Sequence, residues 1–380
     1  MYPALAVLQA LTKKSSEPVK EESAQFGTSL SAQSIEVLWI GGVGGMEENL
    51  VERAGIPFRA IPAAGVHGVG LQALPGNLLQ LGRGFMSARQ IIRRFRPDVL
   101  LFTGGYLAVP VAMAARTPIP GIKRPRSLLY VPDIEPGLAI KTVARFADQI
   151  TTTVSETSEW LPSKAQVIVT GYPLRNDMRA WDREEARQHF GLEPDIPVLL
   201  VFGGSKGARS LNRSLLKALP EFLVEMQVIH LSGQLDWPEV ERSREGLSAE
   251  LADRYHAYPY LHEEMGAAMT VADLVVSRAG ASTLGELPFY GLPAVLVPYP
   301  HAWRYQKVNA TYLARRGAAV IVEDEAISAN LLDVVRDLMR SATRREEMRR
   351  EMKSLAQPQA ADCIASLLVH LAENSPREGC

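Results

Sequence analysis

Short apolar runs alternate with amphipathic segments along most of the chain. In the first half, strands are predicted at 37–40, 97–102, 127–131, 149–154 and 167–169, and the first of these is expected to be buried. Apolar residues recur at helical spacing between them, at 2–14, about 46–54, 107–115 and 138–147. Strands that alternate with helices in this way predict parallel β-α-β units.

The same pattern starts again after Pro173. It predicts strands at 198–202, 227–231, 255–260, 274–276 and 294–297, and helices that include 265–270 and 360–373. Two such halves predict an α/β fold with two Rossmann-like, doubly wound parallel-sheet domains. We expect residues 1–172 to form the first domain and 173–357 the second, with a helix at 358–374 packing back on the first. Loops at the strand carboxyl ends would then line one cleft.

Glycine-rich turns follow several of the predicted strands. They lie at Gly41–Gly45, Gly104–Tyr106, Gly203–Ala208 and Gly280–Thr283. Such turns let backbone N–H groups approach an anion at the start of a helix. The first turn lacks the third glycine of a dinucleotide fingerprint, because Glu47 stands in its place, so a dehydrogenase is a poor fit.

The most informative stretch runs from 272 to 310. Gly280, Ala281, Ser282 and Thr283 are expected to open a helix whose N–H groups face a phosphate, and Glu286 lies one turn deeper, where nucleotide sites place the carboxylate for ribose hydroxyls. Beyond the next strand, polar groups suited to reading sugar hydroxyls recur at helical spacing: Tyr305, Gln306 and Asn309. The alternative is an ordinary β-α-β unit with a polar loop.

Composition narrows the partners. The chain has 380 residues, 22% of them charged, and a net charge of −1, so no overall field favours nucleic acid. Its two cysteines, Cys363 and Cys380, lack the spacing of a metal site or a disulfide framework. No apolar run reaches the roughly 18 residues that a membrane-spanning helix needs.

Leucines and arginines gather between residues 63 and 96. The segment 63–84 is expected to be a loop because of its glycines, and Arg83, Arg89, Arg93, Arg94 and Arg96 lie near apolar side chains such as Leu79 and Phe85. This mixture suits the surface of an anionic bilayer. A helix that faces the core and has a solvated basic side is an equal alternative.

With these motifs in order, the chain resembles the MurG family. The resemblance covers nearly the whole chain, and its most specific pieces are Gly104–Tyr106, Gly171–Arg175, Gly203–Asn212 and Ser277–Asn309. It implies a GT-B fold and an inverting glycosyltransferase on the cytoplasmic face of the cell membrane, bound peripherally. The implied reaction moves N-acetylglucosamine from UDP-N-acetylglucosamine to undecaprenyl-diphospho-N-acetylmuramoyl-pentapeptide (lipid I), which gives lipid II. Cell-wall synthesis proteins are further implied partners, and no cofactor is implied.

The resemblance also assigns roles to positions of this sequence. It implies that Glu286 binds the ribose, that Arg175 and Ser205 lie beside the uridine, and that His262 lies near the uracil through its backbone. Ala281 and Ser282 would offer N–H groups to the diphosphate, and Gln306 would read the sugar. Gly104, Gly105 and Tyr106 would face the diphosphate of the acceptor.

The chain departs from the family pattern in three places. Family members begin with a strand and a GGTGGH-like loop before the PALAV helix, whereas this sequence begins inside that helix. A misassigned start or a truncated chain is one explanation, and an inactive chain is the other. The family's HEQN segment appears here as Tyr130–Asp133, and Tyr305 stands where some members have glutamine.

The expected chemistry needs a general base but no metal. Helix-start N–H groups would stabilise the leaving UDP, and no acidic pair has the pattern of a metal site. With the family histidine absent, Asp133 is the nearest candidate base by position, although a carboxylate beside prolines can simply be solvated. The alternatives are another GT-B glycolipid transferase, a UDP-sugar epimerase of similar architecture, and a non-catalytic chain that binds UDP-sugars.

Overall fold

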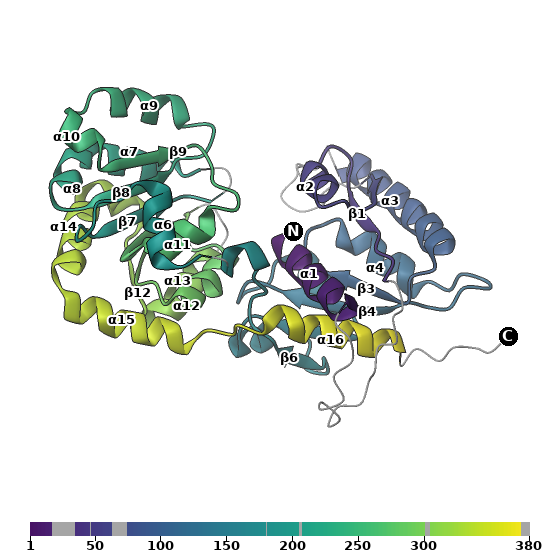
Figure 1. The fold of residues 1–380 in the computed structure, drawn as a ribbon. Coiled ribbons are helices and arrows are strands. Elements are labelled where there is room, and N and C mark those ends of the chain that lie inside the picture. The colour runs from purple at the N-terminus through teal and green to yellow at the C-terminus, as the bar shows by residue number, and fades with distance from the viewer. Residues whose placement is uncertain are drawn as a thin grey trace. The chain divides into compact units, whose positions relative to one another are not determined.

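The computed structural model describes residues 1–16, 35–45, 47–62, 74–179, 181–204, 207–300 and 305–373. By contacts the chain divides into two compact units. The first comprises Met1–Pro132, Pro136–Pro173 and Gln359–Cys380, and the second comprises Asp133–Glu135 and Leu174–Pro358. Figure 1 traces the chain through both units, and each unit is described by itself below.

A six-stranded parallel sheet forms the centre of the second unit among the described residues. Its strands, in the order in which they pair, are β12 (Ala319–Ile321), β11 (Ala294–Leu296), β10 (Leu274–Ser277), β7 (Val198–Phe202), β8 (Gln227–Leu231) and β9 (Tyr255–Tyr258). Every pairing in this sheet is parallel. In chain order the first strand lies beside the fourth, so the strand order reverses between β7 and β10, as in a doubly wound fold.

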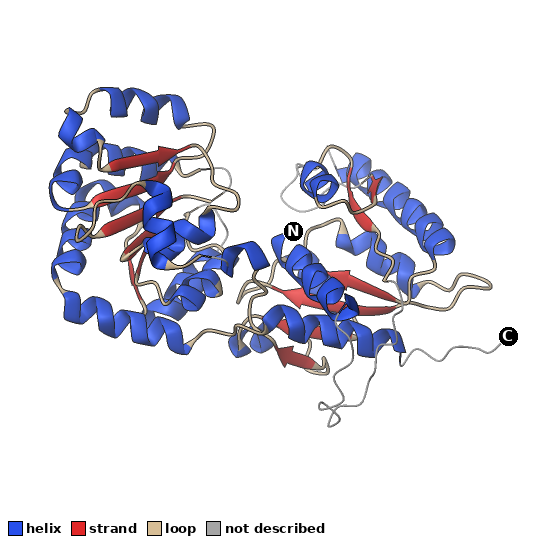
Figure 2. Cartoon of the chain, in the orientation of Figure 1, coloured by secondary structure: helices blue, strands red, loops and turns tan. Residues whose placement is uncertain are grey.

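Helices connect these strands and cover the sheet (Figure 2). They are α6 (Arg183–Phe190), α7 (Arg209–Lys217), α8 (Leu219–Glu225), α9 (Trp237–Glu245), α10 (Ala249–Ala252), α11 (Met265–Val271), α12 (Glu286–Tyr290), α13 (Tyr305–Arg315), α14 (Ile327–Arg340) and α15 (Ala342–Ser354). Short 3₁₀ turns add η2 (Asn176–Arg179), η3 (Ala281–Leu284) and η4 (Asp324–Ala326).

The core of the second unit follows from its apolar strands. All five residues of β7 are buried, as expected for a central parallel strand with both faces covered. On one face Leu199 and Val201 pack with Leu211 and Leu215 of α7 and with Val335 of α14. This packing fixes the carboxyl ends of β7 and β10, where two of the glycine-rich turns begin.

The first unit contains two parallel sheets. β1 (Trp39–Gly42) pairs with β2 (Phe58–Ile61), and the second sheet has the order β3 (Val99–Phe102), β4 (Arg126–Val131), β5 (Gln149–Thr152) and β6 (Val167–Val169). Its helices are α1 (Tyr2–Ser16), α2 (Glu47–Arg53), α3 (Leu74–Phe95), α4 (Ala108–Arg116), α5 (Leu138–Ala144) and α16 (Ala360–Glu373), with the 3₁₀ turn η1 (Ser155–Trp160).

Residues far apart in the sequence complete the first unit. The terminal helix α16 packs along α1 and against β3 and β4, which Figure 1 shows as the yellow and purple helices side by side. A separate core joins α3, α4 and α5 to the sheet through residues such as Ile92, Val111 and Val143. No described helix is both long and apolar enough to cross a membrane.

Two local predictions are wrong. The segment 63–84 is not a loop throughout, since α3 begins at Leu74; residues 63–73 lie outside the described part. Position 84 of that helix requires glycine, because a Cβ there would lie 2.3 Å from the carbonyl oxygen of Pro62. The first strand lies at 39–42, and only Gly41 in it is buried, because β1 pairs with β2 alone among the described strands.

Candidate functional site

The strand order of the second unit reverses between β7 and β10. In open α/β sheets ligands bind outside the carboxyl ends of the strands at such a reversal. The loops that follow these two strands are Gly203–Ala208 and Gly280–Thr283, which are two of the four glycine turns noted in the sequence. The fold therefore brings these two turns to the same edge of the sheet.

The turn after β7 needs glycine at several positions. A Cβ on Gly203 would lie 2.3 Å from the Cβ of Ala208, and one on Gly207 would lie 2.4 Å from the carbonyl oxygen of Ser232. Gly204 and Gly207 also have positive φ values of 88° and 76°. The turn is therefore built from close backbone contacts. Ser205, expected beside the uridine, lies outside the described residues.

The turn after β10 differs from the expected helix start. Ala281–Leu284 form the 3₁₀ turn η3, and the α-helix α12 begins only at Glu286 and ends at Tyr290. Gly285 interrupts the two with backbone angles outside the helical range. The expectation of one continuous helix from Gly280 is therefore wrong. The backbone N–H groups of Ala281 and Ser282 have no acceptor among the described residues, so an anion could accept from both.

Glu286 and Arg175, which are far apart in the sequence, lie near each other. Burial raises the pKa of Glu286, while a hydrogen bond with the Ser282 side chain and the charge of Arg175 lower it in part. Arg175 Nη1 also lies 2.9 Å from Oδ2 of Asp177 in the segment that enters the second unit. A carboxylate and a hydroxyl therefore meet beside the Gly280 turn, and the Arg175 guanidinium is close enough for its charge to act on the carboxylate.

The helix α13 carries the polar residues expected to read a sugar. Gln306 accepts a hydrogen bond at its Oε1 from the backbone N–H of Tyr299, at 2.8 Å. Burial, followed by the neighbouring Glu135 and Asp133 carboxyls, raises the pKa of Tyr305. Asn309 is fully buried and its amide is bound to protein groups, so the expectation that it reads sugar hydroxyls is wrong.

Asp133 belongs by contact to the second unit, although β4 of the first unit precedes it in the chain. Its Oδ1 accepts a hydrogen bond of 2.9 Å from Nδ2 of Asn309, which also donates to the carbonyl oxygen of Ala279 at 3.2 Å. Asn309 Oδ1 accepts from the backbone N–H of Ile134 at 3.3 Å. One buried amide therefore holds the candidate base beside the Gly280 turn.

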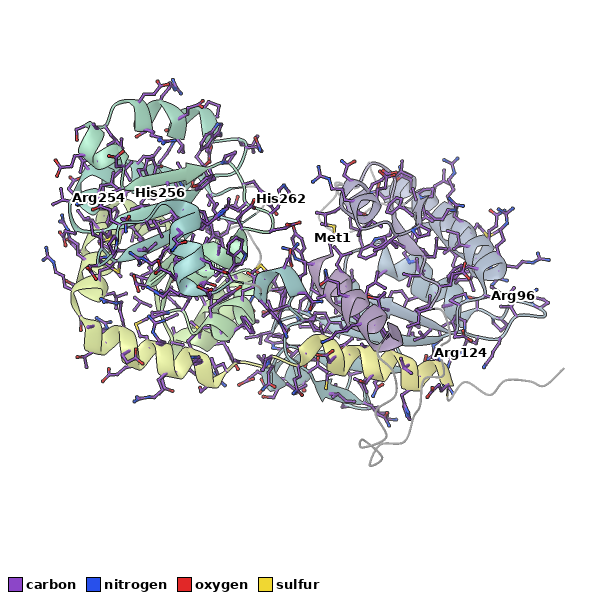
Figure 3. All side chains as sticks on the ribbon, in the orientation of Figure 1. Met1, Arg96, Arg124, Arg254, His256 and His262 are labelled. Atoms are coloured by element: carbon purple, nitrogen blue, oxygen red, sulfur yellow. The ribbon has the colours of Figure 1, made fainter. Side chains whose placement is uncertain are left out.

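His262 lies on the loop that follows β9, beyond the strand residue His256 (Figure 3). Its backbone N–H donates to Oε2 of Glu264 at 3.1 Å, so that N–H is engaged within the loop. Its ring packs edge-on against Tyr260, with 4.7 Å between the ring centroids. Of the two backbone groups of His262, the N–H is therefore already bonded within the protein.

The first unit presents its own glycine turn at the carboxyl end of β3. Gly104 and Gly105 have φ values of 114° and 84°, which favour glycine, and Tyr106 is exposed. The helix α4 begins two residues later, at Ala108. This local geometry matches a strand–turn–helix anion site.

Arg278 is the residue that sequence reasoning missed. It follows β10 directly and precedes the Gly280 turn, yet its side chain is only 8% exposed. Its guanidinium binds Asp324, Ser210 and the carbonyl oxygen of Val297. A charged residue between a buried strand and a glycine turn was the available signal, because a buried charge needs partners.

Comparisons with known proteins agree with this geometry. The Glycosyltransferase family 28 N-terminal domain matches residues 25–152, and the Glycosyltransferase family 28 C-terminal domain matches residues 198–364. A Roseiflexus sp. (strain RS-1) protein named UDP-N-acetylglucosamine--N-acetylmuramyl-(pentapeptide) pyrophosphoryl-undecaprenol N-acetylglucosamine transferase is 38% identical, over 97% of this chain and 91% of its own length. A protein of the same name from Desulforudis audaxviator (strain MP104C) is 35% identical, over 99% of this chain and 96% of its own. The chain belongs to the MurG family.

A solved structure supports the same assignment. The crystal structure of Acinetobacter baumannii MurG superimposes with a TM-score of 0.71 and 27% identity, covering 97% of this chain and 95% of that one. The expected GT-B fold and the expected family are thereby confirmed. Within the described ranges of this MurG-family chain, no three His, Cys, Asp or Glu side chains gather as a metal site would require.

The Asp133–Asn309 contact predicts a pH dependence of stability. Burial raises the pKa of Asp133 above its ordinary value of 3.8, and the Asn309 hydrogen bond opposes this only in part. The folded protein then holds a proton more tightly than the unfolded chain, so this group's stabilisation is lost as pH rises through the folded pKa. Asp133→Asn removes the buried charge. Compared with the wild-type protein, the variant should therefore gain more stability at pH 7 than at pH 4, measured as the free energy of unfolding in urea.

Asp148→Asn is a control of opposite sign. Burial alone would raise the pKa of Asp148, but hydrogen bonds from Arg124, at 2.6 Å, and Ser127, at 2.9 Å, outweigh it and lower the pKa. That variant should lose stability at pH 7 relative to pH 4. If both variants respond to pH in the same direction, the burial argument for Asp133 is wrong.

Proposed function

We propose that this protein transfers N-acetylglucosamine from UDP-N-acetylglucosamine to the muramoyl hydroxyl of lipid I and so forms lipid II for peptidoglycan synthesis. The observation that carries the proposal is the Glu286 carboxyl beside the Gly280 turn, within reach of the Arg175 charge, where the strand order reverses in the second unit. The relatives named above carry this donor and acceptor in their names. The substrates are therefore a nucleotide sugar and a lipid-linked diphosphate.

The donor is proposed to bind in the second unit. Glu286 accepts hydrogen bonds from the ribose hydroxyls, and Arg175 lies on the uridine side. The resemblance assigns Ser205 to the uridine as well, and that residue lies outside the described part of the chain. Ala281 and Ser282 donate their N–H groups to the diphosphate, with Gly280 and Thr283 as the two ends of that turn. Thr283 supports the turn because its N–H and its hydroxyl both donate to the carbonyl oxygen of Gly280, at 3.1 and 2.6 Å.

Uracil and sugar recognition extend this site. The backbone of His262 is proposed to contact the uracil, and Tyr305 and Gln306 the sugar. Gln306 accepts the bond from Tyr299 at Oε1. The two amide hydrogens on its Nε2 are proposed to donate to a sugar hydroxyl. In the first unit Gly104, Gly105 and Tyr106 are proposed to face the acceptor's diphosphate.

Transfer with inversion needs one displacement. The acceptor hydroxyl attacks the anomeric carbon, the bond to UDP breaks, and the hydroxyl proton passes to a base. The N–H groups at 281 and 282 stabilise charge on the leaving diphosphate. Asp133 is the proposed base: a carboxylate whose pKa is raised by burial takes a proton more readily, and Asp133→Asn should lower kcat by about 10²-fold or more.

A peripheral membrane position fits the lipid-linked acceptor. On α3 the apolar side chains of Leu79 and Met86 are 57% and 66% exposed, and Arg83, Arg93, Arg94 and Arg96 are exposed too; Figure 3 marks Arg96 at the end of this helix. Arg89 is not part of this surface, since it donates to the carbonyl oxygens of Thr117 and Pro118. We propose that the exposed face of α3 contacts the anionic cytoplasmic surface of the cell membrane.

The proposed reaction is tested by turnover. The purified chain, with radiolabelled UDP-N-acetylglucosamine and lipid I in detergent, should yield labelled lipid II and UDP in equal amounts. Diacylglycerol in place of lipid I should give no glycolipid. Release of UDP without glycolipid, or epimerised sugar, would contradict the proposal, and tight UDP-sugar binding without turnover would identify a non-catalytic binder.

Glu286→Ala tests the ribose contact. Loss of hydrogen bonds to a charged group should weaken UDP binding by ~1–3 kcal/mol, measured by isothermal titration calorimetry. Glu250→Ala, an exposed acid on α10, changes the net charge equally and should leave the affinity unchanged. Equal affinities of the two variants for UDP would remove Glu286 from the site.

Arg93→Glu tests the membrane surface. One basic residue near an anionic bilayer contributes about 1 kcal/mol, so reversing the charge should lower partitioning to phosphatidylglycerol-containing vesicles about tenfold in a sedimentation assay. Arg242→Glu places the same charge change on the exposed face of α9 and should leave partitioning unchanged. If the two variants lose binding equally, α3 is not the contact surface.

A further inference from the structure

Arg278 is a buried cation held by three separate segments of the second unit. Its Nη1 donates to Oδ1 of Asp324 at 2.6 Å and to the carbonyl oxygen of Val297 at 3.1 Å, and its Nη2 donates to Oγ of Ser210 at 2.8 Å. Ser210 Oγ in turn donates to Oδ1 of Asp324 at 2.7 Å. The aromatic ring of Tyr299 lies 5.2 Å from the guanidinium carbon. The charge is thus neutralised within the protein.

Arg278 and its three partners follow four neighbouring strands. Arg278 itself follows β10, and Val297 follows β11 directly. Asp324 opens η4 after β12, and Ser210 lies in the first turn of α7, after the glycine turn that ends β7. Since the sheet order is β12-β11-β10-β7, one guanidinium ties four adjacent loops at the carboxyl edge.

This arrangement suits arginine and no other side chain. A planar guanidinium presents several donors at fixed angles, so it can hold three acceptors at once in one geometry. A lysine ammonium would keep the charge near Asp324 but could not reproduce the fixed fork toward Ser210 and Val297. The spacing between the turn after β7 and the turn after β10 therefore depends on the shape of this side chain as well as on its charge.

We propose that Arg278 is a positioning residue for the nucleotide diphosphate. It acts through the loops, holding the Gly280 turn at a fixed distance from the first turn of α7 so that the N–H groups of Ala281 and Ser282 are placed for two phosphoryl groups. We assign it no contact with the phosphates, because three of its five N–H donors bind protein groups and its charge is paired with Asp324. This inference rests on the proposed function, since it assumes that UDP binds at that edge.

Direct contact of Arg278 with the diphosphate predicts the opposite result for one variant. If the guanidinium bound phosphate, Asp324→Asn would free it from its partner and leave UDP affinity equal or higher. If Arg278 acts by holding the loops, Asp324→Asn weakens the same Arg278–Asp324 ion pair that Arg278→Lys disrupts, and it therefore weakens UDP binding. Because both changes remove one tie, their effects in the double variant should not add.

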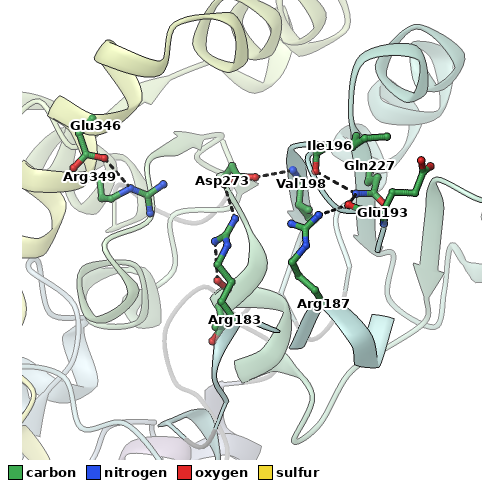
Figure 4. Close-up of polar contacts among 10 residues, drawn as sticks. Arg183, Arg187, Glu193, Ile196, Val198, Gln227, Asp273, Glu346 and Arg349 are labelled. Carbon is green, nitrogen blue, oxygen red and sulfur yellow. Dashed lines mark hydrogen bonds and ion pairs between the residues drawn. The ribbon is translucent and has the colours of Figure 1, made fainter. Parts of the chain in front are cut away.

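A matched control lies at the other edge of the same strands. Arg183 Nη2 pairs with Oδ1 of Asp273 at 2.8 Å, and Oδ2 of Asp273 accepts from the backbone N–H of Val198 at 2.9 Å (Figure 4). Asp273 precedes β10 and Val198 begins β7, so this pair ties the amino ends of the two strands. Arg183→Lys loses a comparable fork far from the glycine turns.

The experiment measures UDP affinity by calorimetry and steady-state kinetics on the full chain. Arg278→Lys and Asp324→Asn should each raise the Kd for UDP and the KM for UDP-N-acetylglucosamine about tenfold or more, since small displacements of binding groups have effects of this size. The melting temperature of Arg183→Lys should fall less than that of Arg278→Lys, because the Arg183 side chain is 47% exposed, and its Kd and KM should stay at the wild-type values.

Each outcome decides between the two claims. Failure of the wild-type chain to bind UDP would overturn the proposed function. Wild-type binding with unchanged affinity in Arg278→Lys, tighter binding in Asp324→Asn, or equal losses in Arg183→Lys would overturn the positioning role alone. Should Arg278→Lys fail to fold, Ser210→Ala removes only one hydroxyl partner, and an unchanged Kd for UDP in that variant would also contradict the role.

Discussion

The parallel pairing of β7 with β10 is the constraint on which the second unit depends. Leu199–Phe202 align with Leu274–Ser277, and all eight of these residues are buried. Because the two strands are parallel, the loops that follow them begin at the same edge of the sheet. The connections after the two strands run in opposite directions, so a crevice opens between the loops. Burial of apolar strands thus places the glycine turns, and no ligand is needed to bring them together.

Polar groups then hold that edge open in a defined shape. Asn309 uses its amide for Asp133, Ile134 and Ala279, and Arg278 uses its guanidinium for Asp324, Ser210 and Val297. Each is buried, so the loss of any partner would leave a desolvated donor or acceptor, which costs more than the bond itself contributes. These bonds consequently hold the loops in place just beyond the carboxyl ends of the strands.

Much of this could be predicted from the sequence. The runs at 198–202 and 227–231 are strands at those residues, and the terminal helix ends at Glu373, because strong apolar periodicity needs no tertiary help. The break at Gly285 between η3 and α12 could not be predicted from the sequence, because many helices tolerate a glycine. Only the backbone angles show the break. The buried state of Asn309 and Arg278 was equally hidden, because their partners lie up to 176 residues away. Segment 133–135 joins the second unit through contacts that no local pattern encodes.

The chain crosses between its two units four times, and each crossing has a proline beside it: Pro132, Pro136, Pro173 and Pro358. Proline fixes its own φ angle and limits the residue before it, so it restricts the local backbone at each crossing. Neither unit is therefore a continuous piece of sequence. A fragment cut at 174 and 358 would lack Asp133 and Ile134 and would leave the Asn309 amide without two of its partners. Dissecting this protein by truncation would damage the second unit even when every residue of its sheet is retained.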